Sequence, residues 1–334
     1  MNDIVLTGIT TTGMPHLGNY VGAIKPSIEA SEKSDVESFF LIADYHSLVK
    51  SKEAEKITDS TFQIAASWLA VGLKSDSIFY RQSDIPEIME LNWILSCFTA
   101  KGLMNRAHAY KSSISENQDL DNKDIDKGIN MGLYCYPILM AADILTFNAN
   151  KIPVGKDQLQ HIEMARDIAN RFNHHYGEIF NIPEAIIGET NSIIPGLDGR
   201  KMSKSYNNTI PMFVEEKNLK KLIMRIKTDS KEPGEPKDPS SSTLFSIFKS
   251  FSDKKAVDEY RKNLIDGISW GEAKNVLFEH LNNHLKDYRK EYSKIIQDKS
   301  YIEKILMEGS IKAREFSVKN IKKIRSAIGI RHLS

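Results

Sequence analysis

Short apolar runs alternate with helical patterns in the first half of the chain, and this alternation restricts the fold more than any other feature. The runs are 4–6, 39–43 and 77–80, and apolar residues at helical spacing lie between them over about 18–30 and 53–71. Short continuous apolar runs separated by helices are typical of strands buried on both faces of a parallel sheet. We therefore predict an α/β fold with a doubly wound parallel sheet.

The rest of the chain is predicted to be mainly helical. Residues 86–150 read as helices interrupted by a polar, mobile loop at 112–126, and a further helix covers about 155–172. The charged Pro/Gly segment 231–239 cannot form a regular element and is expected to join two helices of a second domain. From Ser240 onward the pattern is helical with no strand signal, and the last helix is expected at about 311–328. The second domain is therefore predicted to be smaller and all-α.

Charge is distributed unevenly along the chain, although the net charge is +1. Residues 1–199 hold 16 Lys and Arg against 26 Asp and Glu, whereas residues 200–334 hold 29 against 18. A basic half is a plausible footprint for a polyanion such as nucleic acid. The alternative is a set of solvated, lysine-rich helix faces.

Several classes of protein are disfavoured by the composition. No apolar run approaches the roughly 18–20 residues that span a bilayer, and the first residues lack a secretory signal. Cys97 and Cys135 match no metal-binding spacing and are expected to be buried thiols. We expect a cytoplasmic protein with no membrane partner and no resident metal site.

Two loops carry residues suited to binding phosphate. The first strand leads to Pro15–Asn19 (PHLGN), where a histidine and the start of a helix can approach an anion. The second loop is Lys201–Ser205 (KMSKS), with two lysines three residues apart. Taken separately, the first can be an ordinary turn and the second a basic surface loop.

A third segment, 136–145, can hold an aromatic ligand. Pro137 suits the first turn of a helix, and Tyr136, Met140 and Asp143 would share one face at i, i+4 and i+7. A ring, a thioether and one carboxylate suit an indole, whose one polar group is its N–H donor. The alternative is that Tyr136 and Met140 are core residues and Asp143 an acid on the helix surface.

Together these segments resemble the class I aminoacyl-tRNA synthetases. PHLGN is similar to the His-Ile-Gly-His-type element of that class, and KMSKS matches its Lys-Met-Ser-Lys-Ser element. Their separation of under 200 residues suits the short tryptophan- and tyrosine-specific members. Residues 8–23, 44–46, 136–145 and 153–163 further resemble bacterial tryptophanyl-tRNA synthetases.

The resemblance implies activation of L-tryptophan with ATP and its transfer to tRNA(Trp), with Mg²⁺ bound mainly through the nucleotide. It implies catalytic roles for His16, Asn19, Lys201 and Lys204. Tryptophan would contact Leu6, Gly8, His46, Tyr136, Met140, Asp143 and Gln158, with the indole N–H on Asp143. The implied ATP site comprises Thr10, Thr11, Thr12, His16, Gly18, Asn19, Lys111, Gly155, Lys156, Asp157, Ile194, Lys201, Met202, Ser203, Lys204 and Ser205.

Two segments depart from the family's pattern. Thr10-Thr11 stands where a Gln-Pro pair is usual, so a glutamine contact would pass to a threonine hydroxyl. Ser113 stands where the family often has the second of two lysines, and Lys111 can cover for the missing charge. Neither change removes the core machinery.

The resemblance also implies two domains and a symmetric homodimer. Residues 1–206 would form a Rossmann-like catalytic domain with a helical dimerisation insertion at about 80–150. Residues 207–334 would form a helical domain that binds the tRNA anticodon, with the last helix packing back on the catalytic domain. The following basic residues are either phosphate contacts or parts of solvated helix faces: Lys286, Arg289, Arg314, Lys322 and Arg325.

Three other functions remain open on the sequence. Tyrosine specificity is a close alternative, but Met140 and Asp143 on one face favour indole over phenol. A small nucleotidyltransferase of the same superfamily would usually lack the long helical second half. A non-catalytic RNA-binding paralogue would be expected to lose lysines from the 201–205 loop, and this chain keeps both.

Overall fold

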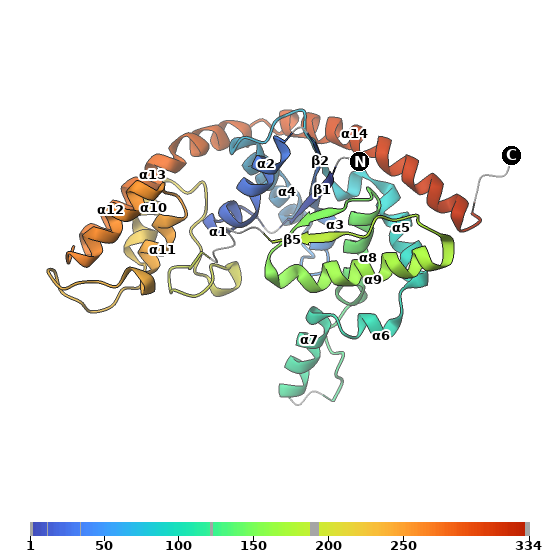
Figure 1. The fold of residues 1–334 in the computed structure, drawn as a ribbon, viewed down its shortest axis with the longest axis horizontal. Coiled ribbons are helices and arrows are strands. Elements are labelled where there is room, and N and C mark those ends of the chain that lie inside the picture. Colours follow the sequence, from blue (N-terminus) through green and yellow to red (C-terminus); the bar gives the residue numbers. More distant parts are fainter. Residues whose placement is uncertain (1–2, 12, 34, 121–122, 188–193, 331–334) are drawn as a thin grey trace.

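A five-stranded, fully parallel sheet lies at the centre of the molecule (Figure 1). The computed structural model describes residues 3–11, 13–33, 35–120, 123–187 and 194–330, and describes Asp157 without its side chain. The strands are β1 (Asp3–Thr10), β2 (Val36–Ala43), β3 (Ile78–Arg81), β4 (Lys151–Pro153) and β5 (Glu184–Ile186). Their order is β3-β2-β1-β4-β5, which confirms the predicted doubly wound sheet.

Strand order reverses at β1, and this places a ligand crevice. The chain leaves β1 for β2 on one side, and after β3 it returns to β4 on the other side of β1. Ligands of such sheets bind outside the carboxyl ends of the strands at this switch point. The sequence did not predict β4 and β5, because strands of three residues are too short to show a period.

Helices cover both faces of the sheet. The first part of the chain contains α1 (Leu17–Asn19), α2 (Lys25–Ser31), α3 (Asp44–Ser47), α4 (Ala54–Ala70), α5 (Pro86–Phe98), α6 (Lys101–Met104), α7 (His108–Asp119), α8 (Met131–Leu145) and α9 (Leu159–Tyr176). Short elements are the π-helix η1 (Tyr20–Ile24) and the 3₁₀ turns η2 (Gln82–Asp84), η3 (Lys156–Gln158), η4 (Lys204–Tyr206) and η5 (Pro239–Ser241).

Successive residues of β2 pack into two different cores. Phe40 and Ile42 join the core that includes side chains of α2 and α4, whereas Phe39 and Leu41 join the core that includes α5, α8 and α9. Successive side chains of a strand point to opposite faces of the sheet. A strand that is apolar at every position therefore needs helices on both sides, which is why the continuous apolar runs predicted this fold.

From Glu216 onward, the described part of the chain contains helices and turns and no strand. The helices are α10 (Glu216–Met224), α11 (Thr243–Lys249), α12 (Lys254–Ile265), α13 (Trp270–Ile295) and α14 (Lys299–Ala327). α10–α13 form a smaller body beside the sheet, and α14 runs back over the sheet as a long helix (Figure 1). No helix in the described ranges combines the length and the apolar character needed to span a bilayer.

α14 covers the edge of the sheet at β3. Gly309 lies so close to this strand that a Cβ atom there would approach the Phe79 carbonyl oxygen to 1.9 Å. An exposed strand edge offers unpaired backbone groups to other chains, and a covering helix removes that hazard. Ion pairs of Arg314 with Glu87 and of Arg325 with Glu90 fasten α14 to α5.

Three predictions of local structure were wrong. α8 begins at Met131, capped by the Asn130 side chain, so Pro137 lies inside the helix and not in its first turn. The segment 112–126 is not one loop, because α7 continues to Asp119. The last helix begins at Lys299, twelve residues before the predicted start at Ile311.

The two cysteines also differ from the prediction. Cys97 is exposed on α5, and Cys135 on α8 is half-buried. The sequence around each cysteine is apolar, so the sequence did not reveal that one face of α5, which carries Cys97, is exposed to solvent.

Candidate functional site

His16 begins the helix that follows β1, and Asn19 closes its cap. The His16 backbone N–H donates to Asn19 Oδ1 at 3.1 Å, and the Asn19 backbone N–H donates to His16 Nδ1 at 3.3 Å. Because Nδ1 accepts a hydrogen bond, the neutral ring carries its proton on Nε2. The cap therefore fixes a histidine N–H donor near the carboxyl end of β1.

Gly18 is required by the close approach of the His16 ring. A Cβ atom at Gly18 would lie 3.0 Å from His16 Nδ1 and 3.6 Å from Met202 Cβ. The missing side chain lets the ring fold over the helix start while Met202 packs beside it. The two loops that the sequence singled out are thus in contact, although 184 positions separate Gly18 from Met202.

Electrostatics keep the His16 ring neutral. Burial of the ring, followed by the positive charges of Lys204 and Lys201, lowers the pKa of His16 from 6.5 to about 4. At neutral pH the positive charge at this site therefore belongs to the lysines, and His16 serves as a neutral donor.

The lysine loop is docked against the loop after β1. Lys204 Nζ donates to the Gly13 carbonyl oxygen at 3.1 Å. Met202 is buried and its backbone N–H donates to the carbonyl oxygen of Ile194, which is also buried. Lys204 lies at the surface, yet partial loss of solvent around its amine lowers its pKa.

Asn208 ties this loop together and was missed by the sequence analysis. Its side chain accepts from the Ser203 backbone N–H at 2.8 Å and donates to the Lys201 carbonyl at 3.1 Å and to Asp198 at 2.7 Å. The bond from Asn208, with further bonds from Arg200, lowers the pKa of Asp198 to about 2. An asparagine three residues beyond the motif gives no sequence signal of this role.

Asp143 is buried on the inner face of α8. Its Oδ2 atom lies 2.8 Å from His46 Nε2, and its Oδ1 accepts from Gln82 Nε2 at 2.7 Å. The His46 ring in turn meets the Tyr136 ring edge to face, with 4.5 Å between centroids. Burial raises the pKa of Asp143, and the bonds from His46 and Gln82 oppose that rise. This carboxylate is therefore not the helix-surface acid of the alternative interpretation.

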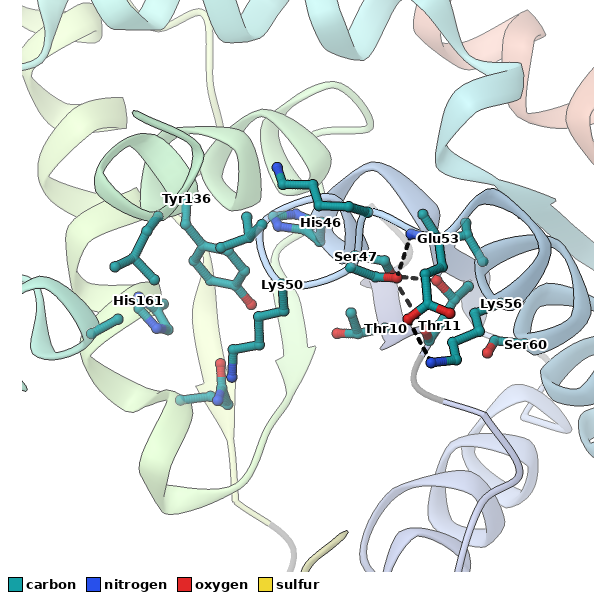
Figure 2. Close-up of a pocket in the computed structure, with 17 residues that line it drawn as sticks. Thr10, Thr11, His46, Ser47, Lys50, Glu53, Lys56, Ser60, Tyr136 and His161 are labelled. Atoms are coloured by element: carbon teal, nitrogen blue, oxygen red, sulfur yellow. Dashed lines mark hydrogen bonds and ion pairs between the residues drawn. The ribbon is translucent and has the colours of Figure 1, made fainter. Parts of the chain in front are cut away.

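A cavity of about 750 Å³ opens beside this cluster (Figure 2). Tyr136 and His161 lie on one side of it, and Glu53, Lys56 and Ser60 on the other (Figure 2). The predicted residues in its lining are Thr10, Thr11, His46, Tyr136 and Gln158. The sequence did not predict the lining residues Ser47, Lys50, Glu53, Lys56, Ser60 and His161.

Thr11, one of the two residues that depart from the family's pattern, makes a structural hydrogen bond. The buried Thr11 hydroxyl is hydrogen-bonded to the Ser47 hydroxyl, which joins the end of β1 to α3. The hydroxyl that replaces a family side chain therefore positions the helix that carries His46.

Other predicted residues are not part of the cavity lining. Leu6 and Gly8 lie in β1, and Met140 lies one turn from Tyr136 on α8. Gly155 precedes η3 as its N-cap, and Lys156 is the first residue of η3. Lys111 is exposed on α7, two residues beyond Ala109, which does line the cavity. Thr12 and the Asp157 side chain lie outside the described residues.

A parallel sheet carries both signature elements, Pro15–Asn19 and Lys201–Ser205, docked together at its switch point. This combination is typical of the class I aminoacyl-tRNA synthetases. Residues 2–286 match the family of tRNA synthetases class I (W and Y). The tryptophan--tRNA ligase of Neisseria meningitidis is 55% identical over 330 residues, 98% of each chain. That of Pseudomonas aeruginosa is 54% identical, over 100% of this chain and 75% of the relative.

A crystal structure of tryptophanyl-tRNA synthetase from Campylobacter jejuni, complexed with ADP and tryptophan, superimposes with a TM-score of 0.88. Its sequence is 42% identical, with 98% of this chain and 99% of that chain covered. The chain belongs to the bacterial-type tryptophan--tRNA ligase family of class I.

Proposed function

We propose that this protein activates L-tryptophan with ATP and then transfers the tryptophanyl group to the terminal adenosine of tRNA(Trp). The observation that carries the proposal is the contact of the two signature loops beside a cavity lined by His46 and Tyr136. The names of the Neisseria and Pseudomonas relatives support it, as do the ADP and tryptophan bound by the Campylobacter protein.

The first step joins a carboxylate to a phosphate. An oxygen of the tryptophan carboxylate attacks the α-phosphorus of ATP, and the bond to the bridging oxygen of pyrophosphate breaks. The carboxylate is already ionised, so the step needs no general base. Catalysis then consists of positioning and of stabilising charge on the α-phosphate and on the leaving pyrophosphate.

His16, Asn19, Lys201 and Lys204 supply that stabilisation in our proposal. The His16 Nε2–H donates to a phosphate oxygen without adding charge, because the ring stays neutral at pH 7. Lys204 already reaches across to the loop after β1, where it donates to Gly13. Exchanging that carbonyl for a phosphate oxygen would bring its ammonium onto the nucleotide.

Tryptophan recognition is assigned to the Asp143 cluster. Asp143 accepts the indole N–H, and the ring lies among His46, Met140, Leu6 and Gly8. Tyr136 and Gln158, which both line the cavity, hold the substrate's ammonium group. Each oxygen of Asp143 already has one partner, so a ligand N–H would use a remaining lone pair.

The remaining nucleotide contacts are proposed from position along the chain. Gly155, Lys156 and Asp157 follow β4 and would hold the ribose, and Thr10, Thr11, Thr12, Gly18 and Lys111 would lie near the phosphates. Met202 would help seat the adenine, and Ile194, Ser203 and Ser205 would belong to the same ATP site. Mg²⁺ would be held mainly by the ATP phosphates.

We further propose the two domains expected from the sequence, 1–206 and 207–334, with tRNA bound across a homodimer. Exposed apolar side chains support a dimer surface within 80–150. Met89 and Trp93 lie one turn apart on α5, with 39% and 72% of their surfaces exposed. Leu120, Ile125 and Met131 are exposed in the same region.

The basic residues left open by the sequence divide into two groups. Arg314 and Arg325 pair with Glu87 and Glu90, and Arg289 donates to Asn282, so these three have partners within the protein. Lys286 and Lys322 are exposed, and they are the better candidates for tRNA phosphates. A protein that charges tRNA would act where translation occurs, which agrees with the expected cytoplasmic location.

Pyrophosphate exchange tests the proposal. With each amino acid in turn, the protein should exchange labelled pyrophosphate into ATP with tryptophan and not with tyrosine. Exchange that depends on tyrosine, or on no amino acid, would contradict the assigned substrate.

A further inference from the structure

The 3₁₀ turn η2 reaches the substrate pocket from the end of β3. Its first residue, Gln82, is fully buried, with none of its surface exposed. The Gln82 amide donates to Asp143 Oδ1 at 2.7 Å, while His46 Nε2 lies 2.8 Å from Oδ2. Gln82 and His46 thus hold the two oxygens of this carboxylate from different directions.

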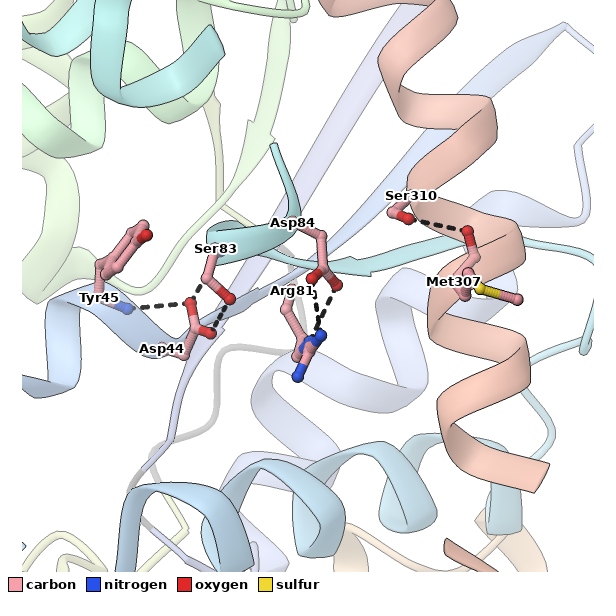
Figure 3. Close-up of polar contacts among 7 residues, drawn as sticks. All are labelled: Asp44, Tyr45, Arg81, Ser83, Asp84, Met307 and Ser310. Carbon is pink, nitrogen blue, oxygen red and sulfur yellow. Dashed lines mark hydrogen bonds and ion pairs between the residues drawn. The ribbon is translucent and has the colours of Figure 1, made fainter. Parts of the chain in front are cut away.

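The same turn also fixes the helix that carries His46. The Ser83 backbone N–H and hydroxyl donate to the two oxygens of Asp44, at 3.0 and 2.5 Å (Figure 3). Asp44 is the first residue of α3, and His46 is the third. η2 therefore positions both hydrogen-bond partners of Asp143. It contains Gln82 itself, and it holds His46 indirectly, through the bonds from Ser83 to the first residue of α3.

Two further contacts hold η2 in place. Arg81 and Asp84, on either side of Gln82, form a two-bonded ion pair at 2.9 and 2.7 Å (Figure 3). Behind them, α14 packs along β3, with Gly309 against the Phe79 backbone. The backbone that carries Gln82 is thus held by the Arg81–Asp84 ion pair and by the packing of α14 on β3.

The buried amide of Gln82 is only partly hydrogen-bonded. Gln82 Oε1 is buried and has no hydrogen-bond partner among the described residues. A buried acceptor without a partner costs free energy, and such costs persist in proteins mainly where function requires them. The gain that offsets this cost is the bond from Nε2 to Asp143.

We propose that Gln82 is a positioning residue for tryptophan selection: it keeps Asp143 ionised and oriented to accept the indole N–H. This inference rests on the proposed function. Without the Gln82 amide, one oxygen of a buried carboxylate loses its donor, so protonation or rotation of Asp143 becomes easier. Protonation weakens, and rotation misdirects, the acceptor that distinguishes an indole from a ring without an N–H.

The test compares two amino acids on one variant. Gln82→Met keeps the length of the side chain and removes the donor. L-tryptophan is compared with β-(3-benzothienyl)-L-alanine, in which sulfur replaces the N–H, by pyrophosphate exchange. For tryptophan we expect kcat/KM to fall between about tenfold and a hundredfold, the range for a hydrogen bond to a charged group. For the analogue we expect a change below about threefold, because it makes no bond that Gln82 supports.

The loss for tryptophan should lie in KM. The indole N–H bond exists both in the bound substrate and in the transition state, and removing such uniform binding raises KM with little change in kcat. The ratio of kcat/KM for the two amino acids does not depend on the fraction of folded enzyme, so partial unfolding cannot produce the effect. Gln82→Leu should give the same ratio if Gln82→Met folds poorly.

Asn282→Leu is the matched control. It replaces another buried amide, on α13 away from the pocket, and should leave the ratio unchanged. Equal losses for both amino acids in Gln82→Met, or no loss for tryptophan, would overturn the inference. Absence of tryptophan-dependent exchange in the unmodified protein would instead overturn the proposed function and this inference with it.

Discussion

Replacing Lys204 with methionine should have two linked effects, one on rate and one on a histidine pKa. The substitution keeps the length of the side chain and removes its ammonium, which donates to the Gly13 carbonyl and lowers the pKa of His16. Loss of one preorganised donor to a developing negative charge typically costs about a hundredfold to a thousandfold in rate. Because Ser113 stands where the family often has another lysine, Lys204 should carry more of this charge, and we expect a loss in that range or above.

The structure also bounds the histidine effect. The pKa of His16 falls from 6.5 to about 4, a fall of about 2.5. Burial is the largest cause of the fall and Lys204 the second, so removal of Lys204 should reverse only part of it. In Lys204→Met the pKa of His16 should rise but stay below its ordinary value of 6.5, because the ring remains buried and Lys201 remains beside it. In the unmodified protein, protonation of His16 should reduce exchange only as the pH falls toward about 4.

Pyrophosphate exchange and NMR titration of the histidine ring protons measure the two effects. The chain has nine histidines, so His16→Gln identifies the His16 signals by their loss. Lys201→Met should raise the pKa of His16 less than Lys204→Met does, because Lys201 is the smallest of the three causes. Lys294→Met, on the exposed face of α13, should change neither the rate nor this pKa. A rate loss below tenfold, about 1.4 kcal/mol, or an unchanged His16 pKa would refute the reasoning.

Three other substitutions, one of them with a matched control, test the account. Asp143→Ala should abolish the preference for tryptophan in competition exchange assays, and unchanged selectivity would remove the indole role. Gly309→Ala should destabilise the fold by roughly 1–3 kcal/mol in urea unfolding, because the new methyl group meets the Phe79 carbonyl. Gly271→Ala, which has no atom within 4 Å of the new Cβ, should cause no loss. Trp93→Asp should give monomers in sedimentation velocity if α5 forms the dimer surface, and a variant that remains dimeric would place that surface elsewhere.

The sequence predicted those parts of the fold in which the spacing of apolar residues shows which side chains are buried. Phe39–Ala43 is apolar at every position because both faces of β2 are covered, and such runs, alternating with helical patterns, predicted the doubly wound sheet. β4 has three residues, too few to show a period. Pro137 misled the prediction because proline favours a first helical turn, whereas here the surrounding core tolerates it inside α8.

The site was predictable where motifs carry the chemistry, and less so where tertiary contacts do. The sequence indicated His16 and Lys204, but it did not indicate that one lowers the pKa of the other. Gln82 and Asn208 support the site through bonds to Asp143 and Ser203. Their partners lie 61 and 5 positions away, and no local pattern shows such pairings.

The most direct test is charging of total tRNA with labelled amino acids. With ATP and Mg²⁺ present, the protein should make tryptophan acid-precipitable on tRNA in stoichiometric proportion to tRNA(Trp), and it should not charge tyrosine. Omission of ATP should abolish the signal. Charging with tyrosine, or no charging by a protein that binds both tryptophan and ATP, would contradict the central claim.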